Sequence, residues 1–135
     1  AGIQALYGQK VWTNGVDNID LSRIDAGMTI RARGGDDRVT GSALDDAIYS
    51  GFGDDIVNAS GGADLIIDTH GSNVLNGEGG DDVIIGGRGQ TVGTGGQGDD
   101  ILIGGSADDD LAGCIGNDTI RGDAESGFFF VAMTS

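Results

Sequence analysis

Large apolar residues recur at every ninth position along most of this chain. Fourteen of the fifteen positions in this series are large and apolar, and the series contains no insertion. Gly93 is the single exception. A fixed short period is typical of repeat proteins, in which each repeat adds a side chain to one continuous core. The fourteen residues are Ile3, Trp12, Leu21, Ile30, Val39, Ile48, Val57, Ile66, Leu75, Ile84, Leu102, Leu111, Ile120 and Phe129.

The residues between these apolar positions predict short strands that alternate with turns. From Ala32 to Arg121 the chain divides into ten units of nine residues, with the regular apolar residue at position eight. Positions seven to nine suit a three-residue strand whose middle side chain points inward, because side chains alternate across a strand. The six preceding residues suit a turn. Two units therefore build one coil of about 18 residues, and successive coils stack at the ~4.8 Å spacing of paired strands.

Glycine and aspartate occupy fixed places within these turns. Position four is Gly in eight of the ten units, and position six is Asp in eight, with Asn73 and Thr91 as the exceptions. Glycine adopts backbone conformations that other residues resist, and the short Asp side chain suits a tight turn. The position-six aspartates are Asp37, Asp46, Asp55, Asp64, Asp82, Asp100, Asp109 and Asp118, and the position-four glycines include Gly35, Gly53, Gly62, Gly80, Gly98 and Gly116.

Composition agrees with such turns and excludes several classes of protein. The 135 residues include 28 Gly, no Pro, 20 Asp and two Glu, and the formal net charge is −15. This charge opposes binding to nucleic acid or to an anionic membrane. No apolar run is long enough for a membrane helix, no signal peptide of the usual kind is recognisable, and one Cys provides no disulfide framework. Disorder is the main alternative, but 38% hydrophobic residues at regular spacing argue against it.

The unit resembles Gly-Gly-x-Gly-x-Asp-x-U-x, the nonapeptide of the RTX (repeats-in-toxin) family, in which U is large and apolar. The clearest copies are Gly77–Ile85 and Gly95–Ile103. The resemblance implies an all-β fold, a right-handed parallel β-roll with two nonapeptides per coil, that binds several Ca²⁺ ions and is secreted or displayed at the cell surface. In the family, each ion lies between turns of successive coils on the same side. The position-six aspartates and position-four glycines named above are therefore the expected metal-binding residues.

Bound Ca²⁺ also answers a physical difficulty of the repeat. Each unit buries only about one aliphatic side chain, which does not offset the entropy lost in ordering nine residues. The aspartates of neighbouring turns repel one another as well. Ca²⁺ takes six to eight oxygen ligands from carboxylates and backbone carbonyls, and Gly-rich turns expose such carbonyls. A fold that forms on binding the ion is the expectation.

Units two apart lie on the same edge of such a roll, so the two edges differ in their acids. One edge carries Asp at all five turns and is expected to hold up to four ions in a row. The other is expected to bind reliably at Asp37 and Asp55 and weakly around Thr91. The unit that contains Thr91 and Gly93 is also a candidate for a bulge. Acids at position five are interpreted as solvated turn residues, with indirect support of the ions as the alternative. They are Asp36, Asp45, Asp54, Asp81, Asp99 and Asp108.

Positions seven and nine point outward and give the two faces different characters. On the face that follows the all-Asp edge, three consecutive strands show two aliphatic residues each: Leu65, Ile67, Val83, Ile85, Ile101 and Ile103. The simple interpretation is β-propensity. The sharper one is a docking surface for a second copy, another subunit or a neighbouring domain, because contiguous aliphatic patches are unusual on a monomer. The opposite face carries a polar file of Thr40, Asn58, Asn76 and Thr94.

The two ends of the chain depart from the repeat. Residues 1–31 keep the apolar spacing without Gly–Asp turns, which predicts an N-terminal cap of coils that bind no ion. Residues 122–135 contain Phe128–Val131 and suit either a C-terminal cap or a tail that resembles the uncleaved type I secretion signal of the family.

The sequence favours a non-catalytic Ca²⁺-binding module that serves as a scaffold or assembly unit. No enzyme is expected here, because the acids recur regularly whereas an active site is singular, and His70 has no partner His or Cys. Cys114 is expected to be a free thiol. The alternatives are an accessory domain of a larger secreted protease, lipase or alginate epimerase, and a surface adhesin or ice-binding protein. A polysaccharide partner is weakly supported, since the charge disfavours a polyanionic one.

Overall fold

The computed structural model describes residues 14–122 and 128–130, which form thirteen strands and no helix. The strands are β1 (Asn18–Asp20), β2 (Thr29–Arg31), β3 (Arg38–Thr40), β4 (Ala47–Tyr49), β5 (Ile56–Asn58), β6 (Leu65–Ile67), β7 (Asn73–Gly79), β8 (Val83–Ile85), β9 (Thr91–Gln97), β10 (Ile101–Ile103), β11 (Asp110–Ile115), β12 (Thr119–Arg121) and β13 (Phe128–Phe130). Nothing in these ranges could cross a membrane as a helix.

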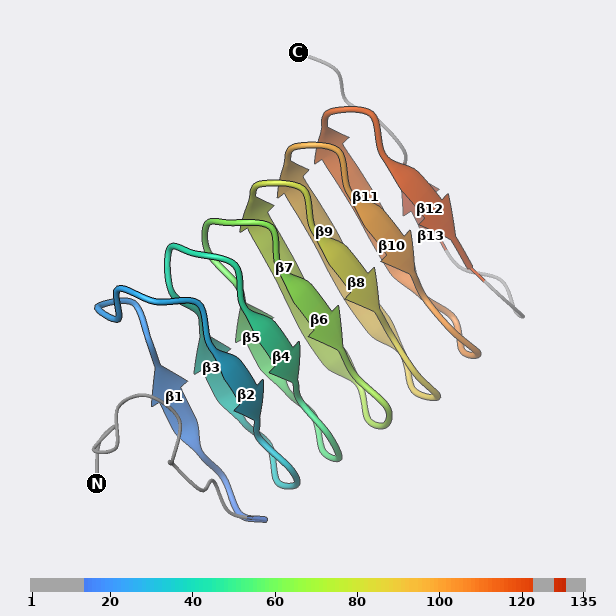
Figure 1. Ribbon diagram of the computed structural model, residues 1–135. Helices are drawn as coiled ribbons and strands as arrows, with labels where there is room; N and C mark the ends of the chain where they lie inside the picture. Colours follow the sequence, from blue (N-terminus) through green and yellow to red (C-terminus); the bar gives the residue numbers. More distant parts are fainter. Residues whose placement is uncertain (1–13, 123–127, 131–135) are drawn as a thin grey trace.

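The strands form two parallel sheets that face each other along the roll (Figure 1). Sheet A has the order β1-β3-β5-β7-β9-β11-β13, and sheet B has the order β12-β10-β8-β6-β4-β2. Within the repeats each strand pairs with the strand two places further along the chain, so that Leu65 lies beside Val83 and Val83 beside Ile101. This 18-residue step confirms the predicted β-roll of two nonapeptides per coil.

Side chains point alternately inward and outward through each unit, and this alternation continues beyond the strand residues. The position-eight side chains of most units are fully buried between the sheets, as at Ile48, Ile66 and Ile84, whereas Ile120 is partly exposed. The same alternation buries position six before the strand and position one after it, as at Asp82 and Gly77. The position-six carboxylates therefore lie inside the roll, next to the aliphatic column.

The first coil departs from the predicted nine-residue spacing. Ile19, and not Leu21, pairs with Val39, so that β1 and β3 are offset by 20 residues instead of 18. Leu21 is also buried, but it lies just after the strand. The prediction of a series without insertion is therefore wrong in this coil, because two extra residues are accommodated in its connections. Ile3 and Trp12 lie outside the described residues.

The expected bulge at Gly93 is also absent. β9 runs from Thr91 to Gln97 and pairs in register on both sides, with Gly93 opposite Leu75 and Leu111. A missing side chain removes core volume but leaves the backbone hydrogen-bonding groups in place, so the parallel ladder continues. β1 and β2, within the segment predicted as a cap, extend the two sheets in the same way. Most of residues 122–135 lie outside the described ranges, and the predicted C-terminal cap or tail stays a prediction.

The gap in the aliphatic column at Gly93 predicts a stabilising substitution. A Cβ at this position would approach the Leu111 Cδ2 to 3.0 Å and the Leu102 Cδ2 to 3.7 Å, and both are flexible ends of side chains. We expect Gly93→Ala to stabilise the Ca²⁺-loaded protein by about 0.5–1 kcal/mol, since a strand Gly is conformationally costly. Thermal unfolding in excess Ca²⁺ measures it, with Gly80→Ala (φ 107°) as the destabilised comparison. A lower Tm for Gly93→Ala would contradict this expectation.

Candidate metal-binding turns

The position-six side chains connect successive coils through one carboxylate oxygen. The backbone N–H of Asp64 donates to Oδ1 of Asp82 at 2.8 Å, and the N–H of Asp82 donates to Oδ1 of Asp100 at 2.8 Å. The same bond recurs at both edges and reaches back to the N–H of Asp17 and Met28 in the first coil. Each carboxylate therefore accepts a hydrogen bond from the coil before it, which orients it within the turn.

The second carboxylate oxygen has no such partner. Within the described ranges, Oδ2 is buried without a hydrogen bond in seven of the eight predicted ligands: Asp37, Asp55, Asp64, Asp82, Asp100, Asp109 and Asp118. A buried carboxylate oxygen that receives no donor carries a large desolvation cost unless a cation or another donor approaches it. These oxygens are therefore the strongest indication of where a cation belongs.

Asp46 is the exception among the predicted ligands. Its Oδ2 accepts the N–H of Ser42 at 2.7 Å, and the Ser42 hydroxyl lies 2.9 Å from Oδ1 and 3.1 Å from Oδ2. Ser42 stands at position two, and Leu44 replaces the glycine of position four in the same turn. This turn satisfies its carboxylate with its own hydrogen bonds, which the sequence pattern did not reveal.

The regular spacing of glycines has a steric cause in these turns. All six predicted position-four glycines have a positive φ, and at Gly80 and Gly98 a Cβ would collide with a backbone carbonyl oxygen of the preceding coil. The position-one glycines serve a different purpose. A Cβ on Gly77 or Gly95 would collide with Oδ2 of the Asp in the same turn. Glycine at position one thus makes room for the unpartnered oxygen.

Backbone conformation divides the turns into regular and irregular ones. We call the turns that lead into sheet B edge B and those that lead into sheet A edge A. On edge B, turns 59–64, 77–82, 95–100 and 113–118 all have positive φ at positions two and four, whereas turn 41–46 has neither. On edge A, turns 32–37 and 50–55 have both, and turns 68–73, 86–91 and 104–109 lack one or both. The backbone therefore matches the asymmetry expected from the acids, except that turn 41–46 of the all-Asp edge is irregular.

The position-five acids form a second ladder that runs in the opposite direction. Oδ1 of Asp81 accepts the N–H of Asp99 in the following coil at 2.9 Å, and Oδ1 of Asp99 accepts the N–H of Asn117 at 2.9 Å. Asp36, Asp45 and Asp54 make equivalent bonds. These exposed side chains therefore tie coils together directly. Their regular spacing was visible in the sequence, but the partner was not.

The buried carboxylates have strongly altered proton affinities in the metal-free protein. Burial raises the pKa of Asp55 and of Asp64 to about 7, and that of Asp82 and of Asp100 to about 6. The N–H of the preceding coil lowers each pKa, and the charges of neighbouring aspartates raise it again. Without a cation, these four carboxyls therefore keep their protons to a higher pH than an ordinary Asp does.

Carboxylates alone cannot complete a metal site in these turns. In the described ranges no three His, Cys, Asp or Glu side chains gather closely enough to hold a metal ion. The acids occur instead as pairs on successive coils, surrounded by Gly-rich backbone. Ca²⁺ readily takes backbone carbonyls beside one or two carboxylates, whereas Zn²⁺ prefers Cys and His. The donor set therefore fits Ca²⁺.

His70 and Cys114 do not belong to the ladder of position-six side chains. The ring of His70 stacks on Phe52 of the preceding coil, with centroids 4.3 Å apart. Cys114 is a partly exposed free thiol at position two of its turn and has a φ of 77°.

The outer face of sheet B carries the predicted aliphatic patch. Five of its six residues are partly exposed, and Ile101 is 41% exposed. Arg31 at one end of this face lies over the Tyr49 ring, with its guanidinium carbon 4.9 Å from the ring centroid, and Arg121 occupies the other end. From β2 to β12 the outward positions of this sheet contain no acid. This is unusual for a chain with a net charge of −15.

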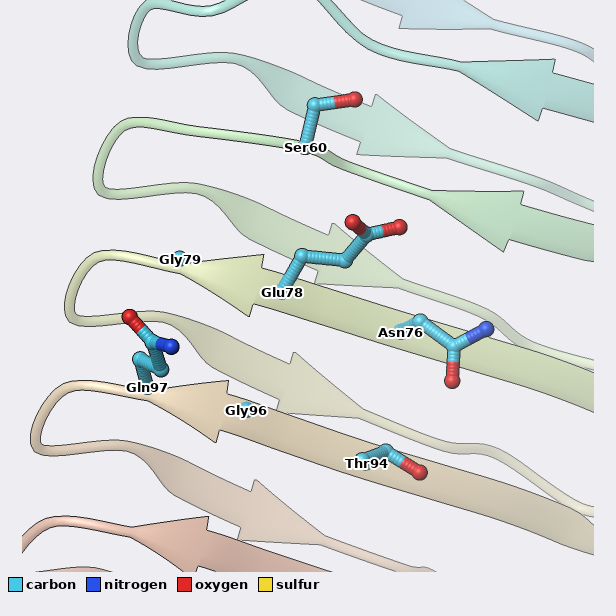
Figure 2. Close-up of a pocket in the computed structure, with 7 residues that line it drawn as sticks. All are labelled: Ser60, Asn76, Glu78, Gly79, Thr94, Gly96 and Gln97. Atoms are coloured by element: carbon cyan, nitrogen blue, oxygen red, sulfur yellow. The ribbon is translucent and has the colours of Figure 1, made fainter.

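A polar groove lies where sheet A continues into the edge-B turns (Figure 2). Its volume is about 560 Å³, and it is lined by residues of three successive coils. Asn76 belongs to the predicted polar file, and its amide donates to Oδ1 of Asn58 at 2.9 Å. The lining residues are Ser60, Asn76, Glu78, Gly79, Thr94, Gly96 and Gln97.

Comparison with known families identifies the repeat. The family of the RTX calcium-binding nonapeptide repeat (4 copies) matches residues 31–66, 58–92 and 94–128, which is well over half of the chain. The chain therefore belongs to the RTX calcium-binding repeat family, and its repeats bind Ca²⁺. Neither the comparison with curated proteins nor the comparison with solved structures gives a match.

The raised pKa values predict how the metal-free protein responds to pH. The ordinary pKa of an Asp carboxyl is 3.8, whereas the pKa of Asp55 in the folded protein is about 7. Between these values the folded state binds more protons, so the contribution of such carboxyls to stability is greatest below pH ~4 and is lost as the pH rises towards ~7. In chelator we expect more β structure at pH 4.5 than at pH 7.5, measured by circular dichroism. A metal-free β signal that grows as the pH rises would contradict this account.

Proposed function

We propose that this chain is a non-catalytic RTX module that folds on binding extracellular Ca²⁺ and then serves as a structural scaffold or assembly unit. The observation that supports it most is the set of seven buried Asp Oδ2 atoms without a donor in the described ranges. Such a core is costly without cations and becomes favourable with them. Ca²⁺ sites of extracellular modules bind with a Kd of about 10⁻⁴–10⁻³ M, so the fold would form outside the cell.

The unpartnered oxygens assign the ions to particular gaps between coils. We assign a regular position-six site to each gap in which both turns have a free Oδ2, and four gaps meet this condition: Asp37/Asp55, Asp64/Asp82, Asp82/Asp100 and Asp100/Asp118. We infer at least four ions per chain. Asp46 is assigned a hydrogen-bonding role, and the gaps around Thr91 are assigned no full site. Four Ca²⁺ ions would reduce the formal net charge from −15 to −7.

Removal of Ca²⁺ provides the direct test of folding. At pH 7.5 we expect the chelator-treated chain to lose most of its β signal, because several buried carboxylates would be ionised without partners. Titration with Ca²⁺ should restore the signal cooperatively, since Asp82 and Asp100 each belong to two gaps. Circular dichroism with parallel measurement of bound Ca²⁺ follows both changes. A fold that is indifferent to chelator would refute the proposal.

Two adjacent aspartates provide a matched control. Asp82→Asn removes the charge from a buried carboxylate with a free oxygen, whereas Asp81→Asn makes the same charge change at position five. Both variants keep a side-chain oxygen for the N–H bond of the ladder. We therefore expect Asp82→Asn to lose bound Ca²⁺ and to need more Ca²⁺ to fold, and Asp81→Asn to behave nearly as the wild type. Equal effects of the two variants would argue against the assignment.

The aliphatic face of sheet B suits self-association of the loaded module. Its outward positions are apolar at the centre and free of acid, so a second copy can approach while the acidic turns stay at the edges. We propose a second copy as the occupant, packed sheet against sheet.

Substitution within this face tests the assembly. Ile85→Lys with Ile103→Lys should abolish self-association in Ca²⁺, because two desolvated ammonium groups would be buried at the contact. Val92→Lys, on the outer face of sheet A, is the control and should leave the assembly intact. Light scattering over a range of concentrations measures both. Association that persists in the double variant, or a wild type that stays monomeric throughout, would contradict the proposal.

Surface recognition is the second candidate function. The groove in Figure 2 presents amide, hydroxyl and carboxylate groups in a volume of ligand size. Such a hollow suits a polar ligand of an adhesin-like protein. A role as the accessory domain of a larger secreted enzyme remains compatible with the same Ca²⁺-binding roll.

A further inference from the structure

Turn 68–73 differs from the repeat at two coupled positions. Asn73 replaces Asp at position six, and Asp68 stands at position one, where most units have Gly or Ala. Asp68 is 2% exposed, and its Oδ2 accepts a hydrogen bond from the Asn73 amide nitrogen at 2.6 Å. This turn therefore has its buried carboxylate at position one instead of position six, and the side chains at the two positions are hydrogen-bonded to each other.

Asn73 retains only part of the function of a position-six residue. Its Oδ1 accepts the N–H of Asp55 at 2.7 Å, which continues the ladder between coils. Its other terminal atom is an amide nitrogen, which donates to Asp68 and to the carbonyl of His70. A nitrogen that donates hydrogen bonds offers no lone pair to a cation. Judged by position six alone, this turn would provide no anionic ligand.

The facing turn still presents an unpartnered oxygen. Asp55 is 1% exposed, and its Oδ2 has no hydrogen bond from the described residues. Burial is the main cause of its raised pKa, and the negative charge of Asp68 contributes, so the two carboxylates interact electrostatically. Two buried acids that repel each other are stabilised either by a proton on one of them or by a shared cation.

The Asp68 carboxylate is held in a fixed orientation by several donors. Ser50 Oγ, on the preceding coil, donates to Oδ1 of Asp68 at 2.7 Å, and Asn73 holds Oδ2. Burial raises the pKa of Asp68, whereas hydrogen bonds from Ser50 and from the backbone N–H groups of Thr69 and His70, together with the charge of His70, lower it. Partners of this kind commonly orient metal ligands. Stacking of Phe52 on His70 joins the same two turns.

We propose that Asp68 is a Ca²⁺ ligand, and that with Asp55 it forms an additional site between turns 50–55 and 68–73, completed by backbone carbonyls. The position-one carboxylate replaces the position-six carboxylate that the nonapeptide pattern requires. The inference rests on the proposed Ca²⁺-binding function and adds one gap to the four assigned above.

The number of ions bound by the full chain tests the proposal. Wild type, Asp68→Asn and Asp82→Asn are dialysed against Ca²⁺ buffer, and bound Ca²⁺ per chain is measured by elemental analysis, with circular dichroism as the check of folding. We expect Asp68→Asn to bind one ion fewer than wild type. Asp82→Asn, which changes a regular gap, should lose at least one.

A double variant keeps the question answerable if Asp68→Asn fails to fold. Asp68→Gly with Asn73→Asp restores the ordinary pattern of the repeat in this turn. It should bind the same number of ions as wild type, because the carboxylate only changes position. One ion more than wild type, or a wild-type count in folded Asp68→Asn, would show that Asp68 only closes the gap by hydrogen bonds and would overturn the proposal. A wild-type count in Asp82→Asn would instead count against the proposed function.

Discussion

The structure depends on the buried position-six carboxylate, whose two oxygens have different surroundings. One oxygen of each position-six Asp accepts an N–H from the coil before it, and the other is left without a donor in seven of eight cases within the described ranges. The first oxygen makes the coils stack in register. The second destabilises the stack when no metal ion is bound. The same side chain therefore orders the coils and destabilises the stack when no metal ion is bound. The Ca²⁺ that the family binds removes this destabilisation and leaves the order in place.

The nine-residue period was enough to predict the parallel β-roll, the strand positions and the inward residues of the repeats. It succeeded because each unit is one turn and one strand, so local chemistry and global stacking agree. It failed at Ile19, where two extra residues shift the pairing in the first coil. It also failed at Gly93, because the backbone hydrogen bonds between strands do not depend on whether position eight carries a side chain.

The metal-binding turns were predictable as a set but not individually. The sequence pattern treats Asp46 and Asp82 alike, and only the contacts show that Ser42 satisfies one and nothing described satisfies the other. Asn73 is the converse case, since the pattern records a lost acid and the contacts show Asp68 beside it. Both differences arise between residues four or five apart within a turn. A repeat pattern that treats each position separately cannot represent such pairs.

The alternation of the two sheets restricts how the length of this chain can change. Successive nonapeptides belong to opposite sheets, so their edges and outer faces alternate along the sequence. Loss of a single nonapeptide would exchange the sheets for every later unit. The aliphatic residues of β8 and β10 would move to the face of Asn58, and Asp82 would stack on the edge of Asp55. Lengthening or shortening by whole pairs preserves both faces. The 18-residue coil is therefore the smallest length change that preserves both faces, although the visible period is half as long.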